Sequence, residues 1–196
     1  GFKVAKFIAA TGECADEFEV WADEIAAVRG GQEVGRLASR PPTPNPLDGE
    51  LPTFAWFDEP HRLTLPRHIA AHTTTLENLE KRRDADAWVF ESGTPGQPGE
   101  QSVAEDTRDY AEAIDQGRTE NRSLFFFGRF APLEMPLETK EDVIAALAEA
   151  TGPDTWSADS DRLAERYFAP KTNRAYWRRV WLGQWVQGEN QAIDHQ

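Results

Sequence analysis

Short apolar runs alternate with amphipathic stretches through the middle of this sequence, and the alternation limits the folds open to it. Thr53–Phe57, Ala87–Glu91 and Leu124–Phe130 are short and rich in aromatic residues, as buried strands often are. Leu65–Arg82 and Ser102–Gln116 lie between them and carry apolar residues at helical spacing. Strands interleaved with helices predict an α/β fold with a mainly parallel sheet and helices on both faces.

The two ends of the sequence differ from this middle part. Phe2–Ala10 is predicted as a strand, Ala15–Val28 as a helix, and Gly30–Glu50 as a proline-rich loop that can include a short strand at Val34–Ser39. The last third is predicted to be helical, at about Lys140–Glu149, Asp159–Phe168 and Asn173–Val186.

Length indicates one domain, because 196 residues suffice for a single sizeable core. Its α/β part is predicted over residues 1–135 and its helical part over residues 136–196. The sequence starts at Gly1, and its only methionine is Met135. We therefore expect a processed product, an excised domain or a fragment of a longer protein.

Charge and composition exclude several functional classes. Acidic residues outnumber basic ones by 34 to 21, so the net charge of −13 disfavours non-specific binding to nucleic acid or anionic lipid. The single Cys14 excludes an intramolecular disulfide framework and is typical of a reducing compartment. No apolar run approaches the roughly 20 residues that a membrane helix needs. We expect a soluble, intracellular protein.

Asp58 and Glu59 directly follow the first apolar run of the α/β pattern. Ligands of such sheets lie at the carboxyl ends of the strands. An ATP hydrolase of the P-loop kind needs one carboxylate there to hold Mg²⁺ through water and another to activate the attacking water. The sequence therefore predicts Asp58 as the metal-side residue and Glu59 as the catalytic base. The alternative is a solvated strand end before the turn at Pro60.

Ser92, Gly93 and Thr94 follow the next predicted strand and are expected at the same edge of the sheet. Together with the acidic pair, they resemble a Walker B strand followed by a Ser/Thr-Gly/Ala-Thr coupling motif. The hydroxyls of that motif sense the γ-phosphate, so Ser92, Gly93 and Thr94 are candidate nucleotide-binding residues. The alternative is a glycine- and proline-rich turn without a catalytic role.

Three stretches resemble the large subunit of a double-stranded DNA phage terminase, of the kind found in actinobacterial phages and prophages. They are LDGELPTFAWFDEPHRL (Leu47–Leu63), GTPGQPGEQSVAEDTRDYAEAI (Gly93–Ile114) and NRAYWRRVWLGQWVQGENQAID (Asn173–Asp194). Leu47–Leu63 resembles the Walker B strand with its trailing helix, and Gly93–Ile114 resembles the coupling segment. Asn173–Asp194 is similar to the helix that closes the ATPase domain.

This resemblance implies a P-loop-NTPase-like fold with ATP and Mg²⁺ as ligands. It also implies double-stranded DNA, a small terminase subunit and the portal as partners, in the cytoplasm of the bacterial host. In the family, a nuclease domain with metal-binding acids follows the closing helix.

Two features depart from the family pattern. A Walker A loop needs a lysine directly after a glycine to reach the β- and γ-phosphates, and no lysine of this sequence follows a glycine. The nuclease domain would follow a segment like Trp181–Asp194, but the sequence ends at Gln196. We therefore expect the later, incomplete part of a terminase ATPase domain, which alone neither hydrolyses ATP at a useful rate nor cuts DNA.

Two other functional classes stay open. One is a non-catalytic relic or partner-binding regulator derived from a terminase. The other is a different P-loop-like ATPase such as a helicase, which needs further arginine-bearing motifs after the coupling strand. Arg122 and Arg129 are too isolated to form such motifs.

Three histidines have both a functional and a structural interpretation. His68 and His72 lie one helical turn apart and can bind a metal, but no third ligand or HExxH glutamate accompanies them. His61 follows Asp-Glu-Pro and can contact a nucleotide or the coupling segment. Its alternative is a solvated turn residue.

Trp177, Trp181 and Trp185 recur every four residues, with several arginines around them. A stripe at helical spacing packs in a core or docks against a neighbour, and the family's nuclease domain is the expected neighbour. Stacking on nucleic acid is the alternative.

Overall fold

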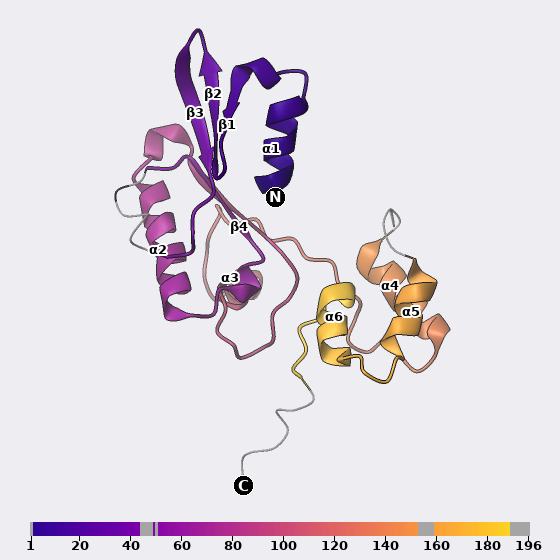
Figure 1. Ribbon diagram of the computed structural model, residues 1–196. Coiled ribbons are helices and arrows are strands. Elements are labelled where there is room, and N and C mark those ends of the chain that lie inside the picture. The colour runs from indigo at the N-terminus through magenta and orange to yellow at the C-terminus, as the bar shows by residue number, and fades with distance from the viewer. Residues whose placement is uncertain (1, 44–48, 50, 153–158, 189–196) are drawn as a thin grey trace. The chain divides into compact units, whose positions relative to one another are not determined.

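A computed structural model describes residues 2–43, 49, 51–152 and 159–188 of the chain (Figure 1). The chain divides into two compact units, one formed by Gly1–Thr53 with Ala70–Ala87 and the other by Phe54–Ile69 with Trp88–Gln196. The boundaries between the two units follow Thr53, Ile69 and Ala87, whereas residue 135 is where the sequence predicts the end of the α/β part. Both units contain strands and helices, which confirms a mixed α/β protein.

The first unit contains a helix and an antiparallel sheet, which lie side by side in Figure 1. Its elements begin with α1 (Phe2–Thr11), a one-turn 3₁₀ helix (Ala15–Glu17), β1 (Phe18–Val20), β2 (Glu24–Arg29) and β3 (Gln32–Ala38). The sheet has the order β1-β2-β3. Of the predictions for this region, the strand near Val34–Ser39 is confirmed.

The predicted strand at Phe2–Ala10 is wrong, as is the predicted helix at Ala15–Val28. The first stretch contains three alanines, which favour a helix as much as its apolar residues favour a strand. In Ala15–Val28, the apolar residues have helical spacing, but hydrogen bonding between neighbouring strands forms a sheet instead. Gly30 and Gly31, at φ of 60° and 76°, form the two-residue turn that joins β2 to β3. Positive φ at both positions is typical of a type I′ hairpin turn.

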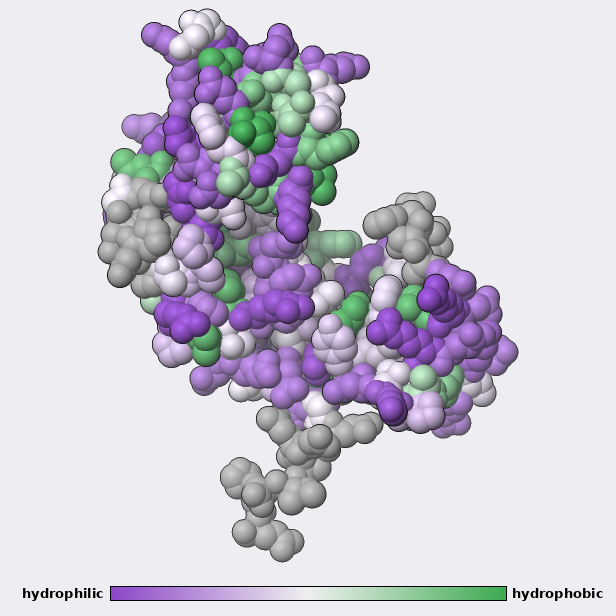
Figure 2. All heavy atoms as spheres, in the orientation of Figure 1, coloured by the Kyte–Doolittle hydropathy of each residue, from purple (hydrophilic) through white to green (hydrophobic). Residues whose placement is uncertain are grey.

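Part of the apolar surface of this unit remains exposed. Val4, Phe7 and Ile8 lie on one side of α1 and are 60 to 68% exposed. Hydrophobic residues are visible on this part of the surface in Figure 2. The described residues of α1 bury only Ala9, so the helix contributes little core of its own.

The second unit contains a two-stranded parallel sheet formed by β4 (Phe54–Asp58) and β5 (Trp88–Ser92). Phe54 pairs with Trp88 and Asp58 with Ser92, so both strands end at the same level. The predicted parallel sheet is thus confirmed for this pair, whereas the three strands of the first unit are antiparallel.

The strand predicted at Leu124–Phe130 is wrong, since this stretch has no regular secondary structure. Its sequence is typical of a strand, but within the described residues it pairs with no other strand. Phe125 and Phe127 are 88% and 73% exposed. High strand propensity does not form a strand without hydrogen-bonding partners.

The five helices predicted from Leu65 onward are confirmed, and the last one ends earlier than predicted. The remaining helical elements are a 3₁₀ turn (Pro60–Arg62), α2 (Pro66–Glu80), a 3₁₀ turn (Arg83–Ala85), α3 (Val103–Asp115), α4 (Lys140–Thr151), α5 (Ser160–Tyr167) and α6 (Arg174–Leu182). Side-chain oxygens of Ser102, Thr139, Asp159 and Asn173 cap the last four helices. None of the helices in the described residues combines the length and hydropathy needed to cross a bilayer.

Helices α4, α5 and α6 share a hydrophobic core, which lies among the orange and yellow ribbons of Figure 1. Its buried members are Ala131, Val143, Ala146, Leu147, Leu163, Ala164, Tyr167, Trp177 and Leu182. Helix α6 ends at Leu182 because Gly183 adopts a left-handed conformation, at φ 63°. A Cβ on Gly183 would lie too close to the carbonyl oxygen of Arg129, so only glycine fits.

We expect Leu182→Ala to lower the free energy of unfolding by about 2–5 kcal/mol, because Leu182 is fully buried and the cavity would not refill completely. Chemical denaturation followed by tryptophan fluorescence measures the change. Phe125→Ala removes an exposed side chain and is the control, with an expected effect within about 0.5 kcal/mol. Equal losses for the two variants would contradict this core.

Candidate functional site

The carboxyl ends of β4 and β5 meet at a sharp corner of the chain. The backbone N–H of Glu59 donates to the carbonyl oxygen of Ser92 at 2.7 Å, one residue beyond the paired Asp58 and Ser92. Glu59 then takes a left-handed conformation, at φ 56° and ψ 55°, which is uncommon for a residue with a side chain. This turn leads the chain away from the strand and into the 3₁₀ turn that starts at the buried Pro60.

Gly93 allows the two chain segments to approach this closely. A Cβ on Gly93 would lie 3.0 Å from Cα of Glu59 and 3.1 Å from Cδ of Pro60. Cα of Glu59 cannot move away without changing the turn after β4. A residue with a side chain at this position would therefore displace Glu59.

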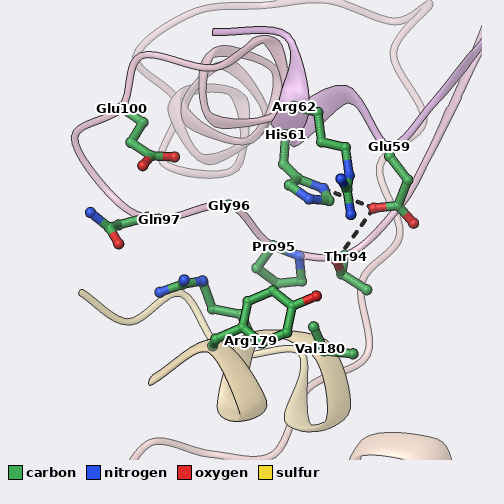
Figure 3. A pocket seen from close by; sticks show the side chains of 11 residues that line it. Glu59, His61, Arg62, Thr94, Pro95, Gly96, Gln97, Glu100, Arg179 and Val180 are labelled. Carbon is green, nitrogen blue, oxygen red and sulfur yellow. Dashed lines mark hydrogen bonds and ion pairs between the residues drawn. The ribbon is translucent and has the colours of Figure 1, made fainter. Parts of the chain in front are cut away.

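A cavity of about 180 Å³ lies next to this corner (Figure 3). Three segments of the second unit line it: the turn after β4, the loop after β5, and helix α6. The lining residues are Glu59, His61, Arg62, Thr94, Pro95, Gly96, Gln97, Glu100, Tyr176, Arg179 and Val180.

The carboxylate of Glu59 contacts two side chains through one of its oxygens. Nδ1 of His61 lies 2.9 Å from Oε2 of Glu59, at ion-pair distance but without the alignment of a good hydrogen bond. The hydroxyl of Thr94 donates to the same oxygen over a long 3.4 Å. Figure 3 shows both contacts as dashed lines. Neither contact uses Oε1, and the Glu59 side chain is 38% exposed.

The imidazole of His61 is more enclosed than this carboxylate, with 16% of its side chain exposed. Burial is the largest effect on this group and holds the pKa of His61 below its ordinary value of 6.5. The charges of Arg62 and Arg179 also lower this pKa, whereas Glu59 and a hydrogen bond to the Thr94 backbone raise it. His61 is therefore mainly neutral at neutral pH.

Two arginines bring positive charge to the cavity. Figure 3 shows Arg62 on the side of Glu59, and the guanidinium of Arg179 on the side of Gln97. Nη1 of Arg179 donates to the carbonyl oxygen of Val186 at 2.9 Å, which fixes part of its guanidinium. The cavity thus combines carboxylate, hydroxyl, imidazole and guanidinium groups, a set that suits phosphate chemistry.

The five residues predicted from sequence have different positions. Glu59 and Thr94 line the cavity and contact each other. Asp58 is exposed at the end of β4 and is not a lining residue. Ser92 directs its hydroxyl to Trp56, whose Nε1 donates to it at 2.8 Å, and Gly93 provides the close approach. The cavity therefore brings together the side chains of two of the five residues.

Metal ligation by protein side chains alone finds no support in the described part of the chain. It contains no group of three or more His, Cys, Asp or Glu residues placed to hold a metal ion. Mg²⁺ usually keeps several waters and takes only one or two carboxylates, so Asp58 as a ligand through water stays a prediction. His68 and His72 do not form part of such a group either.

The three tryptophans do not form one face. Trp177 is 3% exposed and belongs to the helical core, and Trp181 packs against that core. Trp185 lies beyond the end of α6, where the guanidinium of Arg108 lies 4.9 Å from its ring centroid. The packing interpretation is confirmed for Trp177. Because Gly183 ends the helix, helical spacing does not extend to Trp185.

Several lining residues have no role predicted from the sequence, among them Arg62, Tyr176 and Arg179. For His61 and Arg62, the signal is Pro60, which opens a one-turn helix that directs the following side chains back toward Glu59. For Tyr176 and Arg179 no local signal exists, because their position depends on how α6 packs against a loop about 80 residues earlier in the sequence.

Comparison of the chain with protein-family models, with curated proteins and with solved structures finds no match.

We expect the free energy of unfolding to fall as the pH is lowered through 6.5, because the unfolded chain, with the ordinary pKa of His61, binds the proton more readily than the folded chain does. The loss of stability due to His61 is complete once the pH is below the lowered folded pKa. His61→Gln should flatten this part of the pH profile. Denaturation curves at several pH values measure the slope.

His68→Gln is the control, because it removes an imidazole that does not line the cavity. An equal flattening in both variants would contradict the assignment of this pH dependence to His61.

Proposed function

We propose that this chain provides the catalytic-carboxylate part of an ATP-hydrolysing, DNA-packaging motor of the terminase large-subunit kind. Glu59 would act as the general base and Thr94 as the hydroxyl that senses the γ-phosphate. One observation carries this proposal: side chains from the predicted Walker B strand and the predicted coupling motif, 35 residues apart in sequence, meet in one cavity. The P-loop-NTPase-like fold remains part of the proposal.

The size of the cavity supports a site for the reacting phosphate rather than for a whole nucleotide. Ligand cavities for drug-sized molecules usually measure roughly 300–1,000 Å³, compared with about 180 Å³ here. This space suits a phosphate group and the attacking water. The remainder of the nucleotide would need a Walker A loop, and no lysine of the sequence follows a glycine.

The proposed reaction assigns roles to four charged groups, three of which line the cavity. Glu59 accepts a proton from the water, the water oxygen attacks the γ-phosphorus, and the bond to the β–γ bridging oxygen breaks. Arg62 and Arg179 offset the negative charge that spreads over the phosphoryl oxygens. Asp58 would hold Mg²⁺ through water, and the ion would supply charge neutralisation of the phosphates.

The same proposal includes the partners and the location that the family resemblance implies. These are double-stranded DNA, a small terminase subunit, the portal and a nuclease domain, in the cytoplasm of the bacterial host. At a net charge of −13, this chain would not attract DNA by its overall field. We propose that DNA is gripped by a local basic surface or by another part of the motor.

Titration of Mg²⁺-ATP into the purified chain should give no micromolar binding, because the phosphate cradle is missing from its sequence. Isothermal titration calorimetry measures this, with Asp58→Ala in parallel. Micromolar binding that Asp58→Ala removes would contradict the incomplete site. The chain would then be an autonomous nucleotide-binding protein.

ATP hydrolysis tests the role of Glu59 in a complex of this chain with a protein that carries a Walker A loop. Glu59→Gln should then lower kcat for ATP by at least about 100-fold, because general-base catalysis contributes roughly that much. Glu134→Gln, an exposed carboxylate outside the cavity, is the matched control. Equal rates for the wild type and Glu59→Gln would exclude Glu59 as the base.

Another candidate is a non-catalytic, partner-binding segment. It is favoured by one face of the β4–β5 sheet, where Phe54, Trp56, Trp88 and Phe90 are 36 to 57% exposed. Parallel sheets are normally covered on both faces. If this candidate is correct, Glu59→Gln leaves every activity of the chain unchanged.

A further inference from the structure

His61 has no role in the family resemblance, yet it is the closest ionisable partner of the proposed base in the cavity. Its Nδ1 lies 2.9 Å from Oε2 of Glu59, closer than the 3.4 Å of the Thr94 hydroxyl. Both contacts involve Oε2 of Glu59, and neither involves Oε1. We propose that His61 positions Glu59 in the reactive orientation and that protonation of His61 at lower pH withdraws this carboxylate from use as a base.

Backbone contacts on two sides hold the Cβ of His61 in place. The backbone N–H of Arg62 donates to the carbonyl oxygen of Glu59 at 2.9 Å, which closes the turn that contains His61. On the other side, a Cβ on Gly96 would lie 3.1 Å from Cβ of His61. The loop after β5 therefore packs directly against Cβ of His61, which holds the start of this side chain near Glu59.

The charges around the ring explain why the contact can change with pH. Five ionisable groups line the cavity with it: Glu59 and Arg62 from its own turn, Glu100 from the loop after β5, and Tyr176 and Arg179 from α6. Burial and the two arginines lower the pKa of His61, so its neutral form prevails at neutral pH. In acid, the imidazolium forms a full ion pair with Glu59 and competes with water for its negative charge.

The first test measures the coupling between the two side chains and does not depend on ATP hydrolysis. The ring of His61 is titrated by ¹⁵N NMR in the full chain, with the signal assigned by its loss in His61→Gln. Glu59→Gln should lower the titration midpoint of His61 by roughly 0.5–1 pH unit, because it removes the nearest negative charge. Glu100→Gln is the matched control, since Glu100 lines the same cavity without an ion pair to His61.

A shift below about 0.2 unit in Glu59→Gln, or equal shifts in both variants, would overturn the coupling. Both substitutions nearly preserve side-chain shape, so the result does not depend on a variant that fails to fold.

The other test measures positioning and rests on the proposed function. In the ATP-hydrolysing form, His61→Ala should lower kcat about tenfold with little change in KM, because only the orientation of the base is lost. His61→Asn keeps an N–H near the position of Nδ1 and should restore most of the rate. Because asparagine does not titrate in this range, the acid limb of the pH–rate profile should move to lower pH in His61→Asn.

The outcomes separate the two proposals. If Glu59→Gln is inactive while His61→Ala hydrolyses ATP like the wild type, His61 has no positioning role and the proposed function stands. If Glu59→Gln hydrolyses ATP like the wild type, the proposed function fails, and with it the catalytic role of His61. The NMR titration still decides whether the two side chains are coupled.

Discussion

The parallel pairing of β4 with β5 is the interaction on which the candidate site depends. It sets Asp58 opposite Ser92, so the two strands leave the sheet at the same level and their following residues are neighbours. The bond from the Glu59 N–H to the Ser92 carbonyl extends this pairing by one residue into the turn. A shift of one residue in register would place Glu59 and Thr94 on different levels and remove their contact.

The turn at Glu59 and the close approach of Gly93 shape the cavity at the end of the sheet. Glu59 adopts an unfavourable left-handed backbone, and Gly93 has no side chain where a Cβ would meet Glu59 and Pro60. Strained backbone at the end of a strand often accompanies function, because folding alone does not favour it. Here the left-handed backbone accompanies a half-exposed carboxylate that contacts an imidazole and a hydroxyl.

The sequence predicts an element correctly where the determining pattern is local. It does not predict structure that depends on residues far away in the sequence. The stretches that form β4, β5 and α3 to α6 have clear periodicity and capping residues, and they form the predicted element types. Leu124–Phe130 has equally strong strand propensity but no strand to pair with among the described residues. Glu59 and Thr94 were identifiable because they follow strands. Arg179 was not, because no pattern in α6 indicates which loop it faces.

Helix α6 belongs to two structures at once. Trp177 and Leu182 are buried in the helical core, while Tyr176, Arg179 and Val180 line the cavity. A helix of nine residues is about 13 Å long and too stiff to bend between these two sets of contacts. Helix α6 therefore moves as one rigid body. A displacement of its cavity-lining residues by a fraction of an ångström would also change how α6 packs against α4 and α5.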